Sequence, residues 1–254
     1  MGHEIDTQRA AFPEIRNVSF GRPLVWLRNG WRDYRAHPVQ SAFYGVCFAL
    51  MGWLIVLVFR HAYQYVSSLV TGFFLVGPFL AIGLYDLSRR RERGETPKLA
   101  PTLEAWRPNV AALGMFGLVL AVILLVWARA SLVVFALFYT HEMPSLQGFL
   151  EQVFSLDNLE FLVAYFCVGG FFALLVFAIS AISVPMMMDR DTDGVVAVLT
   201  SVKAFGTNLP AMLLWAFIIT VVIGAGFALW FLGLIVAVPV IGHGAWHAYR
   251  DSVA

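Results

Sequence analysis

The sequence has little charge. Only 13% of its 254 residues are Asp, Glu, Lys or Arg, and 60% are hydrophobic, whereas soluble domains carry roughly 25% charged residues. This composition is too apolar for a soluble fold of this length. The net charge of +1 also argues against a nucleic-acid partner, because nucleic-acid-binding domains are strongly basic.

Cysteines are few and catalytic motifs are absent. Cys47 and Cys167 both lie within uncharged apolar stretches, where a small buried apolar residue is expected rather than a disulfide. The sequence contains no G-x-S-x-G, Walker A, Rossmann or H-E-x-x-H motif. Its polar segments are too short for a soluble catalytic domain. We therefore expect neither an enzyme nor a cofactor.

Long apolar stretches, in contrast, are abundant. A helix needs about 20 residues to cross a hydrocarbon layer about 30 Å thick. Five uncharged stretches are long enough: 40–59, 65–84, 110–128, 161–188 and 209–241. The last is too long for one ordinary span, and we expect two short spans that reverse at the Gly-Ala-Gly of 224–226. The alternative is a single steep helix. The sequence thus predicts an all-α membrane protein with six spans.

Prolines group the six spans into three helical hairpins. One proline precedes the first span of each hairpin: Pro38, Pro108 and Pro210. Another lies near the end of each returning span: Pro78, Pro185 and Pro239. We expect this second set to kink its helices and to free backbone carbonyls, which must find partners inside the bundle.

The hairpins form one transmembrane domain over 22–254, after a polar leader at 1–21. Their predicted boundaries are about 22–93, 94–193 and 194–254, and an amphipathic interfacial helix is predicted before each hairpin. The segments PFLAIGLYDLSR and PVIGHGAWHAYR align on their prolines. This alignment and the repeated order of elements predict a pseudo-threefold internal repeat.

The first interfacial helix is predicted over 22–37. One face carries Leu24, Leu27, Trp31 and Tyr34, and another carries Arg28, Arg32 and Arg35. A basic amphipathic helix with aromatic side chains suits the headgroup region of a membrane. We therefore expect its arginines to contact anionic lipid headgroups. Packing against a soluble partner is the alternative.

The positive charge is strongly one-sided. Fifteen of the seventeen Lys and Arg residues precede the first span, follow the last span or lie in the loops between hairpins. Such residues mark the cytoplasmic side, so we expect both termini in the cytoplasm. Only Arg60 and Arg129 fall on the opposite side. Arg129 is expected to snorkel to the outer interface, with an anion contact as the alternative.

Charged residues and one histidine gather where the returning spans end. This predicted polar cluster comprises Asp86, Arg89, Arg90, Asp189, Arg190, His247 and Arg250. We interpret it as helix anchoring and pairing between hairpins. The alternative is a polar vestibule at the cytoplasmic ends of the spans.

Metal ligation has one candidate pair. His243 and His247 are four residues apart, so they face the same side of a helix, as two metal ligands would. No third ligand is evident nearby in the sequence. We expect no metal site and retain this pair as its candidate.

Three segments carry a family resemblance: IRNVSFGRPLVWLRNGWRDYRAHPVQSAFYG, GPFLAIGLYDLSRRRERGE and VPMMMDRDTD. With them the chain, from Ile15 onward, resembles a bacterial family of predicted integral membrane proteins catalogued as domain-of-unknown-function family 2189. The resemblance implies a multi-span protein of the inner membrane. It supplies no established activity.

These observations favour a non-enzymatic structural or accessory component of a membrane complex. Its expected partners are lipids and either another membrane protein or a second copy of the chain. A transporter or channel for a small solute or ion, with its pathway between the hairpins, is the first alternative. An assembly or metal-handling factor for respiratory complexes is the second.

Overall fold

The computed structural model describes residues 12–61, 66–96, 98–138, 159–190 and 192–254. Regular structure in these residues is helical, apart from one isolated β-bridge. The chain divides into two compact units. The larger unit comprises Met1–Leu113 and Ile179–Ala254, and the smaller unit comprises Gly114–Ala178.

The larger unit begins with three helices. They are α1 (Arg22–Ala36), α2 (Pro38–His61) and α3 (Val66–Glu92). A proline fixes φ and lacks an N–H group, so it suits the first turn of a helix. Pro38 opens α2 in this way, and the chain bends at His37, whose φ of −136° and ψ of 62° are not helical. The first predicted interfacial helix is confirmed as a helix.

The remaining elements of the larger unit are shorter or follow the smaller unit. They are α4 (Leu99–Thr102), the 3-10 helix η2 (Arg107–Asn109), α8 (Ser183–Asp189), α9 (Gly194–Thr207), α10 (Leu209–Ala228) and α11 (Leu234–Ser252). Pro108 lies in η2 and Pro210 in the first turn of α10. All three leading prolines therefore stand at or just before a helix start, as predicted.

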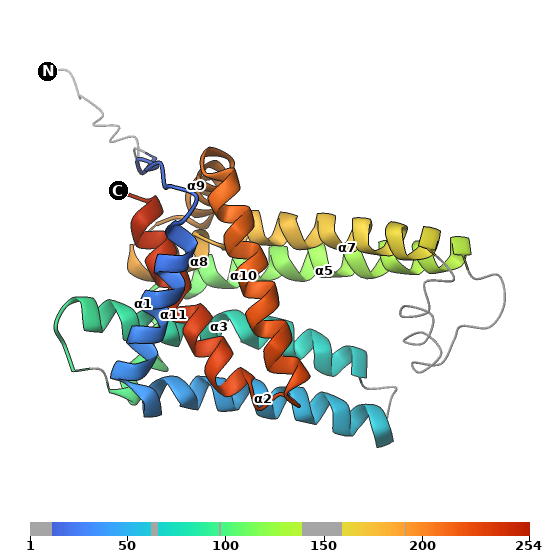
Figure 1. The fold of residues 1–254 in the computed structure, drawn as a ribbon, viewed down its shortest axis with the longest axis horizontal. Helices are drawn as coiled ribbons and strands as arrows, with labels where there is room; N and C mark the ends of the chain where they lie inside the picture. The colour runs from blue at the N-terminus through green and yellow to red at the C-terminus, as the bar shows by residue number, and fades with distance from the viewer. Residues whose placement is uncertain (1–11, 62–65, 97, 139–158, 191) are drawn as a thin grey trace, which may run out of the picture. The chain divides into compact units, whose positions relative to one another are not determined.

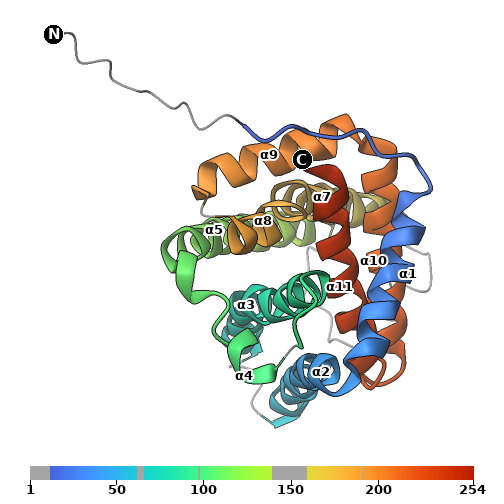
Figure 2. The ribbon, with the colours of Figure 1, turned by 90° about the vertical axis from the view of Figure 1, so that its left-hand side faces the viewer.

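Helices of the larger unit run in two directions. Figure 1 shows α2 and α3 lengthwise, and Figure 2 shows them end-on, whereas α1, α10 and α11 run steeply across them in both views. Helices α1 and α11 lie side by side. Their backbones meet at Gly30, where an added Cβ would collide with the Val240 carbonyl oxygen and lie 2.8 Å from the Gly244 nitrogen. Two glycines thus permit this close crossing.

The apolar run 209–241 forms two helices, so the single-helix alternative is wrong. The reversal, however, lies after Leu229 and not at 224–226. Trp230 and Phe231 adopt positive φ values of 54° and 64°. Gly226 stays helical and packs against Gly233, where an added Cβ would lie 2.7 Å from the Gly226 Cα. The Gly-Ala-Gly sequence therefore serves helix contact, and the turn is made by apolar residues.

The tip of the α10–α11 hairpin contacts the middle of α2. Trp53 of α2 donates a hydrogen bond of 2.8 Å from its indole Nε1 to the Trp230 carbonyl. Gly52 leaves room for the Phe231 ring, which an added Cβ would strike. The hairpin tip thus reaches the level at which α2 is uncharged and apolar.

The three returning prolines differ from one another, which corrects the prediction that all would kink a helix. Pro239 lies inside α11. It leaves the Ile235 carbonyl without its helical donor, and that oxygen faces Gly45 of α2. Pro78 lies inside α3, which continues through it. Pro185 instead occupies the first turn of α8, after the preceding helix has ended.

The smaller unit consists of two long apolar helices. They are α7 (Leu159–Ser180) and most of α5 (Val110–Phe138). Phe135 contacts Phe161 and Tyr165 at ring-centroid distances of 5.2 and 5.8 Å. Helix α5 runs through the exposed Arg129 without a break, so the apolar run after it extends the helix. The predicted loop 140–160 lies mostly outside the described residues.

Four helical segments of the described residues are long and apolar enough to cross a membrane. They are Pro38–Val58, Leu99–Phe138, Leu159–Asp189 and Leu209–Ala228. The chain is therefore an all-α membrane protein with several apolar helices. Side chains 66–76, 78 and 79 of the stretch 65–84 lie outside the description. Six spans, a threefold repeat and the hairpin boundaries stay predictions.

The two ends of the described chain lie together. Ile15 and Val253 form an antiparallel β-bridge, and the Ala254 nitrogen donates to the Glu14 carbonyl at 2.9 Å. Asn208, between α9 and α10, accepts from the Val18 nitrogen at 2.8 Å. Residues 14–16 of the predicted polar leader thus contact the C-terminus, and Val18 is bound to the start of α10.

Candidate functional site

A set of hydrogen-bonded polar side chains lies where α1, α2, α3 and α11 meet; four of its members are buried, and His247 and Arg91 at its edge are partly exposed. We call it the buried polar chain, and its members are Ser41, His243, Ser88, Asp33, His247 and Arg91. Asp33 is 6% exposed and His243 only 1%. A charge or imidazole at this depth is costly unless it is fully hydrogen-bonded. The geometry meets that demand.

The hydrogen bonds fix the tautomer of His243. Ser88 has one hydroxyl proton and donates it to Asp33 Oδ2 at 2.6 Å. At 2.8 Å, its oxygen must therefore accept from His243 Nδ1–H. In the neutral ring, Nε2 is then an acceptor, and the Ser41 hydroxyl donates to it at 2.9 Å.

Asp33 accepts hydrogen bonds from three groups. Besides Ser88, they are His247 Nε2, at 3.0 Å, and the Arg91 guanidinium. Burial raises the pKa of this carboxyl, but the hydrogen bonds from His247 and Ser88 are the main effects that oppose burial, and the pKa is lowered. Asp33 is thus an anion at neutral pH and joins α1 to both α3 and α11.

His243 stays neutral at neutral pH. It follows the end of the apolar run at Ile241, and its burial lowers its pKa to about 4, although the charge of Asp33 opposes this. Its 2.9 Å contact with Ser41 has the spacing of a nucleophile and a general base. Both side chains are buried, however, and Ser41 is 0% exposed. The arrangement is therefore suited to holding four helices together.

A second anion, Asp86 of α3, is paired within its own helix. It is 0% exposed and accepts from Arg89 Nη2 at 2.5 Å and from Arg90 Nε at 2.6 Å. Arg89 also donates from Nη1 to the Met188 carbonyl at 3.0 Å. This arginine therefore ties the end of α3 to the end of α8.

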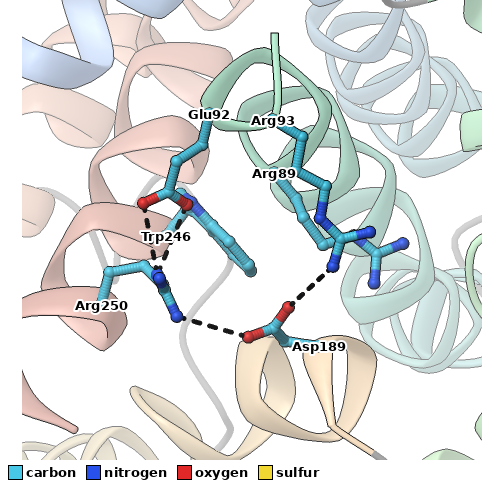
Figure 3. A pocket seen from close by; sticks show the side chains of 6 residues that line it. All are labelled: Arg89, Glu92, Arg93, Asp189, Trp246 and Arg250. Carbon is cyan, nitrogen blue, oxygen red and sulfur yellow. Dashed lines mark hydrogen bonds and ion pairs between the residues drawn. The ribbon is translucent and has the colours of Figure 1, made fainter. Parts of the chain in front are cut away.

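Near these residues, α3, α8 and α11 surround a polar pocket of about 440 Å³ (Figure 3). We call it the arginine pocket, and it is lined by Arg89, Glu92, Arg93, Asp189, Trp246 and Arg250. Asp189 lies 3.9 Å from an Arg93 nitrogen and 3.8 Å from an Arg250 nitrogen. These ion pairs are longer than those of Asp86, and three arginines face two carboxylates.

Two further contacts connect the helix ends. Tyr249 donates to Asp189 Oδ2 and accepts from Arg190 Nε, both at 2.9 Å. Burial, followed by the charge of Asp189, raises the pKa of Tyr249 to about 12, so its hydroxyl stays protonated. Asp251 accepts from Arg22 Nε at 2.9 Å and from the Trp26 indole at 2.7 Å.

The residues of the predicted polar cluster divide into three groups. Asp189 joins Arg190 through Tyr249 and approaches Arg250 directly. Asp86 is covered by Arg89 and Arg90 and does not line the arginine pocket. His247 instead belongs to the buried polar chain through Asp33. The cluster is thus not one vestibule lined by all seven side chains.

Helix α1 has a buried face that the sequence pattern did not predict. Trp26, Gly30 and Asp33 are buried on it and follow steps of four and three. Leu24 and Trp31 of the predicted apolar face are 59% and 44% exposed. The basic face is exposed along its whole length: Arg28, Arg32 and Arg35. The helix therefore packs along α11 with one face and presents its apolar and basic faces outward.

Asp33, Ser41, Ser88 and Arg91 were missed by sequence reasoning. Asp33 shares its helical face with Trp26 and Gly30, and that spacing was the available signal. Ser41 and Ser88 are single serines in or beside apolar sequence, which carries no signal of its own. Only the packing of α2 and α3 against α11 brings them to His243.

The two candidate metal ligands, His243 and His247, both belong to the buried polar chain. Both ring nitrogens of His243 lie within hydrogen-bond distance of serines, and His247 Nε2 faces Asp33. In the described part of the chain, no group of three His, Cys, Asp or Glu side chains is placed to hold a metal ion.

Comparison with known proteins gives one family. Residues 65–189 match the family described as Predicted integral membrane protein (DUF2189), which confirms the resemblance over that segment. Neither the curated proteins nor the solved structures contain a match to the chain.

Proposed function

Starting from the family match over residues 65–189, we propose that the chain is a non-enzymatic, multi-pass protein of the bacterial inner membrane. It serves as a structural or accessory component of a membrane complex, with both termini in the cytoplasm. The observation that carries the proposal is the buried polar chain, in which the polar groups nearest the apolar helices bind one another across α1, α2, α3 and α11.

A rigid helical scaffold follows from these contacts. A catalytic or transport group must meet a substrate, whereas Asp33, Ser88 and His243 are each at most 6% exposed. Breaking a buried polar network is costly because each member would be left without a partner. The network therefore supports a structural role, in which the cytoplasmic ends of these helices are held in a fixed arrangement.

The third hairpin, α10–α11, turns inside the membrane in this proposal, in place of the two complete spans that the sequence predicts there; of its two helices, only α10 is among those long and apolar enough to cross. The hairpin has no Asp, Glu, Lys or Arg between Lys203 and Arg250. At its tip Trp230 is 72% exposed and Leu229 is 63% exposed. These apolar side chains suit lipid, but the backbone of a turn at membrane depth needs internal hydrogen bonds. The Trp53 indole provides one by donating to the Trp230 carbonyl.

The smaller unit offers the surface for a membrane partner. Its helices expose large apolar side chains, among them Leu118 at 66% and Phe166 at 63%. A photo-crosslinking residue at either position should form a discrete protein adduct in intact membranes. The same residue at Leu162, which is 6% exposed, is the matched control and should give none. Lipid adducts alone at both exposed positions would contradict the accessory role.

A small-solute transporter is the second candidate, and the arginine pocket supports it. The pocket has a volume of about 440 Å³, and of its three arginines Arg89 is paired with Asp86, whereas Arg93 and Arg250 lie nearly 4 Å from Asp189. Its long ion pairs leave donors available to a small anion. Flux of such anions into proteoliposomes, lost on Asp189→Ala and retained in Glu104→Ala, would establish transport. Glu104 is the matched control because its ion pair with Arg107 is exposed.

A further inference from the structure

An apolar groove of about 650 Å³ runs between α1, α10 and α11. Helix α1 contributes Leu24, Leu27 and Trp31 to it. The opposite wall is made by aliphatic and small residues of the hairpin: Val222, Ala225, Gly226, Leu229, Gly233, Val236, Ala237 and Val240. This groove lies on the apolar face of α1, where Leu24 and Trp31 remain exposed.

A single charged side chain, Arg28, lines the groove. It lies one helical turn from Leu24 and from Trp31, at the border between the apolar and basic faces of α1. Within the described part of the chain, Arg28 makes no ion pair with a carboxylate, in contrast to Arg22, which binds Asp251 at 2.8 Å. The guanidinium is therefore available to an anion at the edge of an apolar surface.

We propose that this groove binds one anionic phospholipid. Its acyl chain lies along α10 and α11, and its phosphate accepts hydrogen bonds from Arg28. The inference rests on the proposed membrane placement of the α10–α11 hairpin. With the hairpin turned inside the membrane and α1 at its base, the groove passes from the headgroup level into the hydrocarbon.

The chemistry of the groove favours a lipid over an extended peptide or a polar soluble ligand. Every lining residue except Arg28 is apolar or glycine, so the groove offers few partners to the amide groups of an extended peptide. Arginine binds phosphate through parallel hydrogen bonds with planar geometry. One phosphate next to one long apolar chain is the pattern that a phospholipid presents.

The small residues of the hairpin give the groove its depth. Ala225 is exposed on α10 and lines it, whereas Ala228, one turn further on the same helix, is exposed outside it. A phenylalanine at 225 should fill the groove, and a phenylalanine at 228 should not. The two variants therefore carry the same substitution on the same helix and differ only in whether the new side chain enters the groove.

The test is native mass spectrometry of the full chain released from bilayers of phosphatidylcholine with a minor fraction of phosphatidylglycerol. The wild-type chain should retain one phosphatidylglycerol. Arg28→Gln should lower the retained fraction about tenfold, the loss expected for one charge-assisted contact, and Ala225→Phe should abolish it. Arg107→Gln, which lies outside the groove in an exposed ion pair with Glu104, and Ala228→Phe should behave as the wild type.

Equal retention by all variants, or equal retention of phosphatidylcholine, would overturn the proposal. Circular dichroism and the thermal midpoint of each variant establish that it is folded. Failure of the proposed function is distinguishable, because a chain that is not membrane-embedded would not reconstitute into the bilayers. A chain that reconstitutes fully but retains no specific lipid would refute only the groove.

Discussion

Ser88 of α3 donates a 2.6 Å hydrogen bond to the carboxylate of Asp33 of α1. Their sequence separation is 55 residues, and the span of α2 lies between them. This bond orients the serine so that its oxygen accepts from His243. One hydroxyl therefore couples the anion of α1 to the histidine of α11, and the predictions begin from this contact.

Asp33→Asn should destabilise the fold by about 3 kcal/mol, because it removes the buried anion that accepts hydrogen bonds from Ser88, His247 and Arg91. The free energy of unfolding, measured by denaturant titration in detergent, checks this. Glu104→Gln disrupts an ion pair in which both side chains are more than half exposed, and it should cost less than about 1 kcal/mol. Equal effects would refute the structural role of Asp33.

Stability should fall as the pH drops from about 6.5 to 4. The pKa of His243 is about 4 in the folded chain and 6.5 in an unfolded one, so the unfolded state takes up the proton first. Each pH unit in this window costs about 1.4 kcal/mol, which gives a loss of about 3 kcal/mol. Thermal midpoints across this range measure it.

The pKa values of Asp33 and His37 are also shifted, so their contributions must be separated from that of His243. The pKa of Asp33 is lowered from 3.8, so its contribution is lost only below that pH, outside the histidine window. Burial also lowers the pKa of the half-exposed His37, which adds a smaller term of the same sign. His243→Gln should remove most of the dependence, and His37→Gln should remove little. An unchanged slope in His243→Gln would contradict the assignment.

Gly30→Ala should cost about 2 kcal/mol or more, because its methyl group would meet backbone atoms of Val240 and Gly244, which cannot rotate away. The comparison is Gly21→Ala, at which an added Cβ meets nothing within 4 Å. That variant should change the free energy of unfolding by less than about 0.5 kcal/mol. Similar values for the two would show that α1 and α11 are not in backbone contact.

A cysteine in place of Leu232, at the tip of the third hairpin, should react with a membrane-impermeant maleimide from neither side of the membrane. Leu232 is 54% exposed in the chain, so lipid rather than protein must protect it. Cys47 and Cys167 are replaced by alanine first. Glu104→Cys is the positive control and should label only in inverted vesicles. Labelling of position 232 from the outer face would show that the hairpin crosses completely.

Sequence patterns predicted the helices well. Proline at 38, 108 and 210 predicted three helix starts because its fixed φ and missing N–H suit a first turn. The reversal of the last apolar run was misplaced, since glycines signal turn formation and close packing equally. The contacts of Gly226 with Gly233 and Leu234 are visible only once the two helices are folded together.

Composition and periodicity by themselves determined that this is an all-α membrane protein, because long uncharged stretches need lipid and satisfy their backbone groups within helices. They also determined which charges lie near helix ends. Tertiary structure alone decided that Asp33, Ser41, Ser88 and His243 form one buried chain. The physical reason is that a lone serine or aspartate gives no periodic signal. Which side chains such a residue contacts depends on the close crossing of α1 with α11, a contact between residues distant in sequence.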